Sequence, residues 1–149
     1  MKPSPLNATV RRRLERAARR AAGAAYAPYS QFRVGASVLA KSGRIYSGCN
    51  VENAAYGLGL CAERAAILAA VSAGERDLRA VVVYTPTPLP TSPCGACRQV
   101  IAEFGPDALV ISVCDSKKRL EARLAELLPQ CFGPRDLCRR RRPGVRSRR

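Results

Sequence analysis

The chain has 149 residues, and 47% of them are hydrophobic, which is enough for one domain with its own core. No apolar run reaches the roughly 18 residues that a membrane helix needs, and no signal peptide is visible, so we expect a cytoplasmic protein. The net charge of +15 is concentrated at the ends, with seven basic and one acidic side chain in residues 1–22 and seven arginines in residues 139–149. The central part is nearly balanced, so the overall basicity does not describe a functional site there.

The apolar patterning predicts helices and strands in alternation. Helices are expected at residues 7–25, with Asn7 as the N-cap, and at residues 61–73, 95–104 and 121–129. Strands are expected at residues 32–40, 44–52, 78–86 and 108–115, with a short strand or turn near residues 118–122. This order is typical of an α/β protein with a mixed sheet. We expect one domain over residues 1–138, followed by a disordered arginine-rich tail over residues 139–149.

The chain has seven cysteines and no histidine, so Ser-His-Asp and Cys-His catalysis are excluded. Without a secretory signal a disulfide framework is not expected, and closely spaced cysteines favour a metal site or catalysis. Cys94 and Cys97 form C-x-x-C at the start of a predicted helix. This spacing is typical of tetrahedral zinc sites, and redox-active dithiols share it.

Cys61 lies at the start of another predicted helix, where the positive end of the helix dipole favours a thiolate. Cys61, Cys94 and Cys97 would supply three zinc ligands and leave the fourth position open, as a catalytic zinc site requires. A structural zinc site would need a fourth ligand. That alternative stays open because the chain has four more cysteines: Cys49, Cys114, Cys131 and Cys138.

Glu63 follows Cys61 by two residues. A glutamate beside a zinc-bound water can take a proton from the water and return it to a leaving amine. Three thiolates and Zn²⁺ carry a net negative charge, which weakens the acidification of that water. Arg64 and Arg98 directly follow Glu63 and Cys97 and could offset this charge, or they could be ordinary solvated helix residues.

The order of these motifs resembles a known family. C-A-E followed by P-C-x-x-C is the zinc deaminase pattern. The segments YAPYSQFRVGASV, GCNVENAAYGLGLCAERAA and SPCGACRQVIAEF are similar to those of the small homotetrameric cytidine deaminases, in the cytidine and deoxycytidylate deaminase superfamily. The resemblance runs from about residue 10 to residue 138. It implies a three-layer α/β/α sandwich with a mixed five-stranded sheet.

The resemblance implies the chemistry of the site. Cys61, Cys94 and Cys97 would bind one Zn²⁺ per subunit. Zinc-bound hydroxide would attack C4 of the cytosine ring, with Glu63 as the proton shuttle. Cytidine and deoxycytidine would be converted to uridine and deoxyuridine plus ammonia, in pyrimidine salvage.

The resemblance also implies how the nucleoside is bound. Substrate-binding roles fall on six residues: Asn50, Glu52, Phe32, Ala62, Tyr56 and Phe132. Asn50 and Glu52 would hold the ribose 3′-hydroxyl. Phe32 would pack on the pyrimidine, and the backbone of Ala62 would contact the base. Phe132 would reach the active site of a neighbouring subunit of a homotetramer, and Tyr29 is a further candidate.

Three other functions stay open. A deaminase of another small substrate, such as a blasticidin-type antibiotic, would share the zinc motifs, and the N-V-E-N segment at residues 50–53 argues against it. A nucleic-acid-binding or editing protein would use the basic ends, and residues 139–149 leave a weak contact with a polyanion open. A non-catalytic zinc module would not need Glu63.

Overall fold

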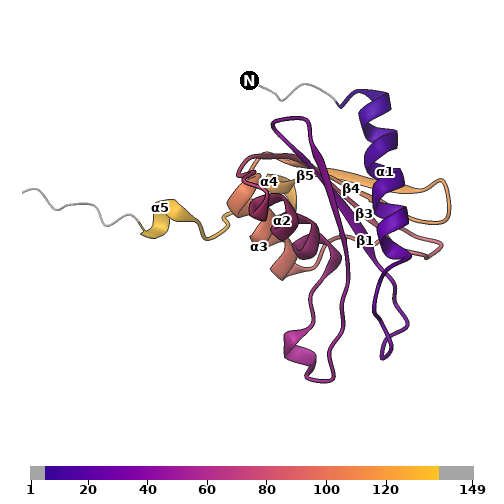
Figure 1. Ribbon diagram of the computed structural model, residues 1–149. Helices are drawn as coiled ribbons and strands as arrows, with labels where there is room; N and C mark the ends of the chain where they lie inside the picture. The colour runs from indigo at the N-terminus through magenta and orange to yellow at the C-terminus, as the bar shows by residue number, and fades with distance from the viewer. Residues whose placement is uncertain (1–5, 138–149) are drawn as a thin grey trace, which may run out of the picture.

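The computed structural model describes residues 6–137, which form an α/β fold on one five-stranded sheet with the order β2-β1-β3-β4-β5. The strands are β1 (Gly35–Ala40), β2 (Ile45–Cys49), β3 (Leu78–Tyr84), β4 (Leu109–Val113) and β5 (Arg119–Arg123). The helices are α1 (Ala8–Ala22), α2 (Ala62–Ser72) and α3 (Gly95–Phe104), with the short helices η1 (Tyr56–Leu58), α4 (Leu124–Leu127) and α5 (Pro134–Leu137). Figure 1 shows α1 on one face of the sheet and α2 and α3 on the other, so the predicted three layers are confirmed.

The sheet is mixed, as predicted. β3 and β4 are parallel, and the other neighbouring strands are antiparallel. α3 is the crossover between β3 and β4, which parallel strands require. In open α/β sheets, ligands bind beyond the carboxyl ends of the strands. The chain leaves β3 at that end and enters α3 at Cys94, so the topology places a cysteine where a site is expected.

α1 covers its face of the sheet with an apolar stripe. Asn7 is the N-cap, as predicted, because its Oδ1 accepts a hydrogen bond of 2.7 Å from the backbone N–H of Thr9. Leu14 and Ala18 are fully buried in a cluster with Val82 and Ile111 of the sheet. The arginines of α1 are therefore left on its sides and outer surface.

α2 and α3 cover the opposite face with small and branched side chains. Ile67 of α2 and Val81 of β3 are fully buried in the larger core cluster. Two glycines let the helices approach the sheet closely. A Cβ at Gly48 would lie 2.5 Å from the backbone nitrogen of Ala66, and a Cβ at Gly35 would lie 2.0 Å from a carbonyl oxygen of α1. Any larger residue at either position would push a helix away from the sheet.

Two loops extend together beyond one end of the sheet. Residues 23–34 and 50–61 lie side by side in Figure 1, and isolated bridges join Tyr26 to Val51 and Val51 to Leu60. The loops include residues 32–34 and 50–52, which were predicted as strand. The first two strands are therefore shorter than predicted: β1 begins only at Gly35 and β2 ends at Cys49. These loops carry several of the predicted substrate-binding residues.

The predicted helix over residues 121–129 is wrong in its first part. Residues 119–123 form β5, which pairs with β4, and α4 covers only Leu124–Leu127. Glu, Ala, Arg and Leu favour helix locally. The free edge of β4 and ion pairs of Glu121 and Arg119 with α1 stabilise the strand instead. The short strand predicted near residues 118–122 is thereby confirmed.

The predicted arginine-rich tail, residues 139–149, and the domain boundary at residue 138 lie outside the described residues. Within residues 6–137, no helix is both long and apolar enough to span a membrane.

Candidate active site and metal centre

Three cysteine thiols meet at the amino ends of two helices. Cys61 is the N-cap of α2, Cys94 is the N-cap of α3, and Cys97 lies in the first turn of α3. The three Sγ atoms lie within 4.8 Å of one another, and those of Cys61 and Cys94 are 4.0 Å apart. The positive ends of two helix dipoles thus point at the cluster, which favours the thiolate forms that bind a metal ion. Burial opposes this effect at Cys97, where it raises the pKa of the thiol.

The geometry of this cluster fits zinc. Zn–S bonds of about 2.3 Å at tetrahedral angles place sulfur atoms roughly 3.8 Å apart, close to the separation of Cys61 and Cys94. A third thiol beside the C-x-x-C pair favours a metal ligand set over a redox dithiol. Among residues 6–137, no fourth histidine, cysteine or carboxylate joins the group. A structural four-ligand site therefore has no support from Cys49, Cys114 or Cys131, and Cys138 lies outside the described residues.

Glu63 lies in the first turn of α2 and is only 5% exposed. Burial raises the pKa of its carboxyl above the usual value. A hydrogen bond from its own backbone N–H, one from the Cys97 thiol and the charge of Arg64 lower the pKa by less. A carboxyl group with a raised pKa can accept a proton and donate it again near neutral pH. Glu63 thus has the properties of an acid–base residue beside a metal site.

Arg64 contacts the cluster directly. Its Nη2 donates to Cys61 Sγ at 3.4 Å and to the carbonyl oxygen of Gly59 at 3.2 Å. The hydrogen bond with Cys61 raises the pKa of Arg64, so the guanidinium stays charged. This positive charge lies where three thiolates and Zn²⁺ would leave an excess of negative charge.

Arg98 does not offset the charge of the cysteine cluster, which was one role considered from the sequence. Its guanidinium donates to the carbonyl oxygens of Pro93 and Leu127 and to Ser92 Oγ, at 2.8 to 2.9 Å. Within the described residues no side-chain hydrogen bond links Arg98 to a cysteine thiol. Arg98 therefore holds the loop that precedes Cys94 and so positions this cysteine. It does not balance the charge of the cysteine cluster.

A cleft of about 260 Å³ opens beside the cysteine cluster. It brings together four of the six residues predicted to bind substrate: Phe32, Asn50, Glu52 and Ala62. Cys61, Cys94 and Glu63 line the same cleft. Residues that are up to 64 positions apart in the chain, Ser30 and Cys94, therefore share one small cavity.

Asn50 fixes the loop that carries Phe32. The backbone N–H of Val34 donates to Asn50 Oδ1, and Asn50 Nδ2 donates to the carbonyl oxygen of Phe32, both at 2.8 Å. A side-chain amide has two hydrogens and two oxygen lone pairs, so one of each is left. Asn50 can therefore contact a ligand without giving up its structural bonds.

Glu52 is held as a carboxylate by the neighbouring loop. It accepts hydrogen bonds from the Ser30 hydroxyl, from the backbone N–H of Tyr29 at 2.9 Å and from that of Ser30 at 3.2 Å. The Ser30 hydroxyl is the main cause that lowers the pKa of Glu52. An ionised Glu52 is a good acceptor for a sugar hydroxyl.

Tyr56 lies outside this cleft. It is 81% exposed on η1, and its ring centroid lies 5.8 Å from that of Tyr29. The two tyrosines line an adjoining hollow of about 320 Å³, which shares Ser30 and Glu52 with the cleft. The structure thus places Tyr56 next to the cleft and not against Glu63.

Phe132 is also absent from the cleft of its own chain. Its side chain lies on the segment that leads to α5, and the residue is 60% exposed. Its carbonyl oxygen accepts a hydrogen bond of 2.8 Å from Gln99 Nε2. A role in substrate binding would therefore require a neighbouring subunit.

Four polar cleft residues were not predicted from the sequence: Ser30, Thr85, Thr91 and Ser92. Three of them belong to residues 85–93, which the sequence indicates only as a Pro/Thr-rich loop. The position of this loop between the carboxyl end of β3 and Cys94 was the signal available. Its hydroxyl-bearing residues Thr85, Thr91 and Ser92 line the same cleft as Phe32 and Glu52.

Comparisons with known proteins agree with this site. The family model of the cytidine and deoxycytidylate deaminase zinc-binding region matches residues 9–113, which include all three cysteines and Glu63. Cytidine deaminase from Sporosarcina psychrophila is 50% identical over 114 residues, 76% of this chain and 84% of the relative. Cytidine deaminase from Mycobacterium tuberculosis (strain H37Rv) is 47% identical over 125 residues, 84% of this chain and 91% of the relative.

Among solved structures, cytidine deaminase from Burkholderia pseudomallei matches with a TM-score of 0.78 and 44% identity, over 81% of this chain and 98% of that one. Sequence and fold thus point the same way over most of the chain. The protein belongs to the cytidine and deoxycytidylate deaminase family, as its motifs predicted.

Proposed function

We propose that the protein catalyses the zinc-dependent hydrolytic deamination of cytidine and deoxycytidine to uridine and deoxyuridine, with release of ammonia. One observation carries this proposal. Three thiols that can hold a metal ion lie together, and two of them, Cys61 and Cys94, line a cleft with the buried Glu63, Asn50 and Glu52. The relatives named cytidine deaminase support the same substrate class.

Cys61, Cys94 and Cys97 would hold the zinc ion, whose Lewis acidity supplies an activated water for attack on the amino-bearing carbon of the base. Glu63 would carry two protons from that water in turn, the first to the ring nitrogen and the second to the leaving amine. Its raised pKa suits both transfers. Arg64 would balance the negative charge of the ligands through its hydrogen bond to Cys61.

The cleft would select a nucleoside. Glu52 would accept a hydrogen bond from a ribose hydroxyl, and the free hydrogen of Asn50 would donate one. Phe32 offers a ring face to the pyrimidine. Ala62 is the first residue of α2, so its N–H has no partner within the helix and can donate to the base. This sugar-binding pair favours a nucleoside over an antibiotic that lacks ribose, and a volume of about 260 Å³ suits one nucleoside.

The test is the ultraviolet absorbance change on adding cytidine, and separately deoxycytidine, to purified protein. We expect the cytidine signal to be lost with zinc-loaded protein, to persist after chelation, and to be lost again when zinc is returned. Zinc content measured on the same samples separates loss of metal from loss of fold. Zinc-loaded, folded protein that leaves both nucleosides unchanged would contradict the proposal.

We also propose a cytoplasmic homotetramer with one zinc per subunit, acting in pyrimidine salvage, with active sites shared between subunits. For the oligomer, the support is the exposure of large apolar side chains on η1 and near the end of the described chain: Leu58 at 73%, Phe132 at 60% and Leu137 at 71%. Sedimentation velocity should give a tetramer. Phe132→Ala should keep that mass and raise the KM for cytidine, and an unchanged KM would separate Phe132 from the site.

A further inference from the structure

α1 has two unlike flanks. On the flank toward β5 its charges are paired across the fold. Arg11 binds Glu121 at 2.5 Å, and Glu15 pairs with Arg119. Arg19 lies 3.7 Å from Asp115. This flank is therefore close to electrically neutral.

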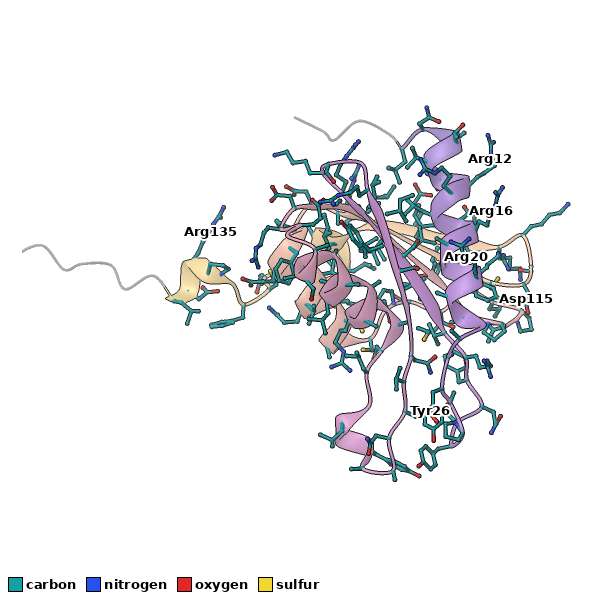
Figure 2. All side chains as sticks on the ribbon, viewed as in Figure 1. Arg12, Arg16, Arg20, Tyr26, Asp115 and Arg135 are labelled. Carbon is teal, nitrogen blue, oxygen red and sulfur yellow. The ribbon has the colours of Figure 1, made fainter. Side chains whose placement is uncertain are left out.

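The flank toward β2 carries three arginines, which we call the α1 arginine strip: Arg13, Arg16 and Arg20. All three are exposed. Within residues 6–137 none of their side chains has an ion pair or a hydrogen bond. In Figure 2, Arg16 and Arg20 follow Arg12 along α1. Positive charge is therefore left unbalanced on this strip, and also on Arg12, whose guanidinium donates to the Thr9 hydroxyl and has no ion pair within residues 6–137.

The strip borders a hollow rather than a flat surface. A cavity of about 320 Å³ is lined by the three arginines together with Ala17, Ile45 and Ser47. Residues three and four apart lie on the same side of a helix, and a rise of 1.5 Å per residue spreads the strip over about 10 Å. Three guanidinium groups thus line one edge of a groove between α1 and β2, the edge strand of the sheet.

We propose that the α1 arginine strip binds the sugar–phosphate backbone of a nucleic acid. Guanidinium groups bind phosphates by paired hydrogen bonds, and unpaired arginines carry no cost of breaking an existing ion pair. The charges follow a line, which suits successive phosphates of a chain. No aromatic side chain lines the hollow, so bases would not be stacked or read there. A second copy of the protein would bring arginines against arginines in a two-fold contact, which like charges disfavour.

This surface is separate from the deaminase cleft and goes beyond the proposed function. α1 covers the face of the sheet opposite to α2 and α3, which carry the cysteines. The cleft of about 260 Å³ is too small for a polynucleotide. Binding along α1 would hold the enzyme on a nucleic acid while the cleft acts on free nucleosides.

The experiment uses the full chain and a fluorescein-labelled 20-nucleotide single-stranded RNA, with binding followed by anisotropy in 50 to 200 mM salt. The variant Arg13→Gln/Arg16→Gln/Arg20→Gln should bind roughly tenfold or more weakly at 50 mM salt, and the slope of log Kd against log salt should fall by about two, as for three lost phosphate contacts. Cytidine deamination should stay at the wild-type rate, because none of these residues lines the cleft.

A matched control removes the same charge elsewhere. Arg76, Arg79 and Lys117 are exposed, and within the described part of the chain their side chains have no ion pair or hydrogen bond. The variant Arg76→Gln/Arg79→Gln/Lys117→Gln should bind RNA nearly as well as the wild type. Equal loss in both variants would overturn the proposal, because net charge alone would then explain binding.

Three further outcomes would also overturn it. If the wild type does not bind RNA at 50 mM salt, the protein has no nucleic-acid site. If the strip variant binds as tightly as the wild type, α1 is not the binding surface, and the affinity comes from elsewhere in the chain, such as the arginines of residues 139–149. If inorganic triphosphate displaces RNA at the same phosphate concentration, the strip is a site for a compact anion and not for a nucleic acid chain. Deamination by the wild type in the same preparation shows whether the proposed function holds independently.

Discussion

The two faces of the central sheet use polar side chains in opposite ways. On the α2 and α3 face, Cys97 is fully buried and Glu63 is 5% exposed. On the α1 face, most of the arginines remain in water, either in exposed ion pairs or unpaired. Burying a polar group costs free energy unless it forms a hydrogen bond or binds a metal. The buried groups of the first face can therefore have altered protonation and can bind a metal ion. The exposed polar side chains of the second face can only contribute modest stability and attract anions. Changes on the two faces should therefore have different consequences.

The largest effect is expected at the metal ligands. Cys97→Ala should reduce zinc to a small fraction of one per subunit and abolish deamination, because two thiols cannot hold the ion firmly. Cys114→Ala is the matched control, since Cys114 is equally buried but lies outside the cluster. Zinc content by mass spectrometry and cytidine turnover are measured on both. Full zinc occupancy in Cys97→Ala would remove this residue from the ligand set.

Glu63→Gln should lower kcat by about 10²- to 10⁴-fold, because the amide cannot carry protons between water, ring and amine. Zinc content should be unchanged, which distinguishes this variant from a ligand variant. Glu75→Gln serves as a comparison, because Glu75 is also buried but is bonded to Ser42 and Arg44 away from the cleft. A Glu63→Gln enzyme with wild-type kcat would favour a non-catalytic zinc module.

On the other face, Leu14→Ala should reduce the free energy of unfolding by about 2–5 kcal/mol, because it leaves a cavity between α1 and the sheet. The kcat of the protein that remains folded should be unchanged. Urea unfolding at a fixed protein concentration measures the first quantity, and steady-state assays at low temperature measure the second. Leu89→Ala, at a 56% exposed residue, should change stability by less than about 0.5 kcal/mol. A selective loss of kcat in Leu14→Ala would show that the two faces are coupled.

Ser30→Ala should raise the KM for cytidine by up to about tenfold, with a smaller effect on kcat, because it removes one hydrogen bond that holds Glu52. The Ser30 hydroxyl is also the main cause of the lowered pKa of Glu52. As pH falls, Glu52 should therefore protonate at a higher pH in the variant, and its KM should begin to rise earlier than in the wild type. KM measured across acidic pH tests both points, and overlapping profiles would exclude Ser30 as a positioning residue.

The smallest effect is expected for the ion pair between α1 and β5. The hydrogen bond with Arg11 lowers the pKa of Glu121, so the pair stabilises the fold above the ordinary glutamate pKa and loses this contribution as pH falls through the lowered value. Glu121→Gln should cost a few tenths to about 1 kcal/mol at pH 7, as partly exposed pairs do. In strong acid the variant and the wild type should unfold at the same urea concentration. If the difference in unfolding free energy between Glu121→Gln and the wild type persists in acid, the ion pair is not its cause. The same holds if Glu103→Gln loses as much stability as Glu121→Gln.

The metal and proton-transfer residues could be predicted because their signal is local. Cys94 and Cys97 are three residues apart, and Cys61 and Glu63 are two apart, each pair at the start of a helix. Short spacing on a regular helix determines which side chains share a side. The contacts of Ser30 and Arg98 could not be predicted in the same way. Ser30 reaches Glu52 across 22 residues, and Arg98 reaches Leu127 across 29, through loops without a regular period.

Strand β5 shows that contacts between distant parts of the chain also limit the prediction of the fold. Its residues favour a helix when considered alone, and they form a strand because β4 offers an unpaired edge beside them. Propensities that differ by fractions of a kcal/mol per residue are easily overcome by a row of ladder hydrogen bonds.

The sequence by itself determined the α/β class, the cysteine and glutamate chemistry and the basic character of α1, because these depend on residue type and on spacings of a few residues. Only the tertiary structure decided which arginines of α1 are neutralised. The acid that pairs with Arg11 lies 110 residues away in the chain, on a strand that the fold brings to one flank of the helix. Coulomb attraction depends on distance in space. On the other flank, no carboxylate among residues 6–137 forms an ion pair with Arg13, Arg16 or Arg20, so their charges stay unbalanced.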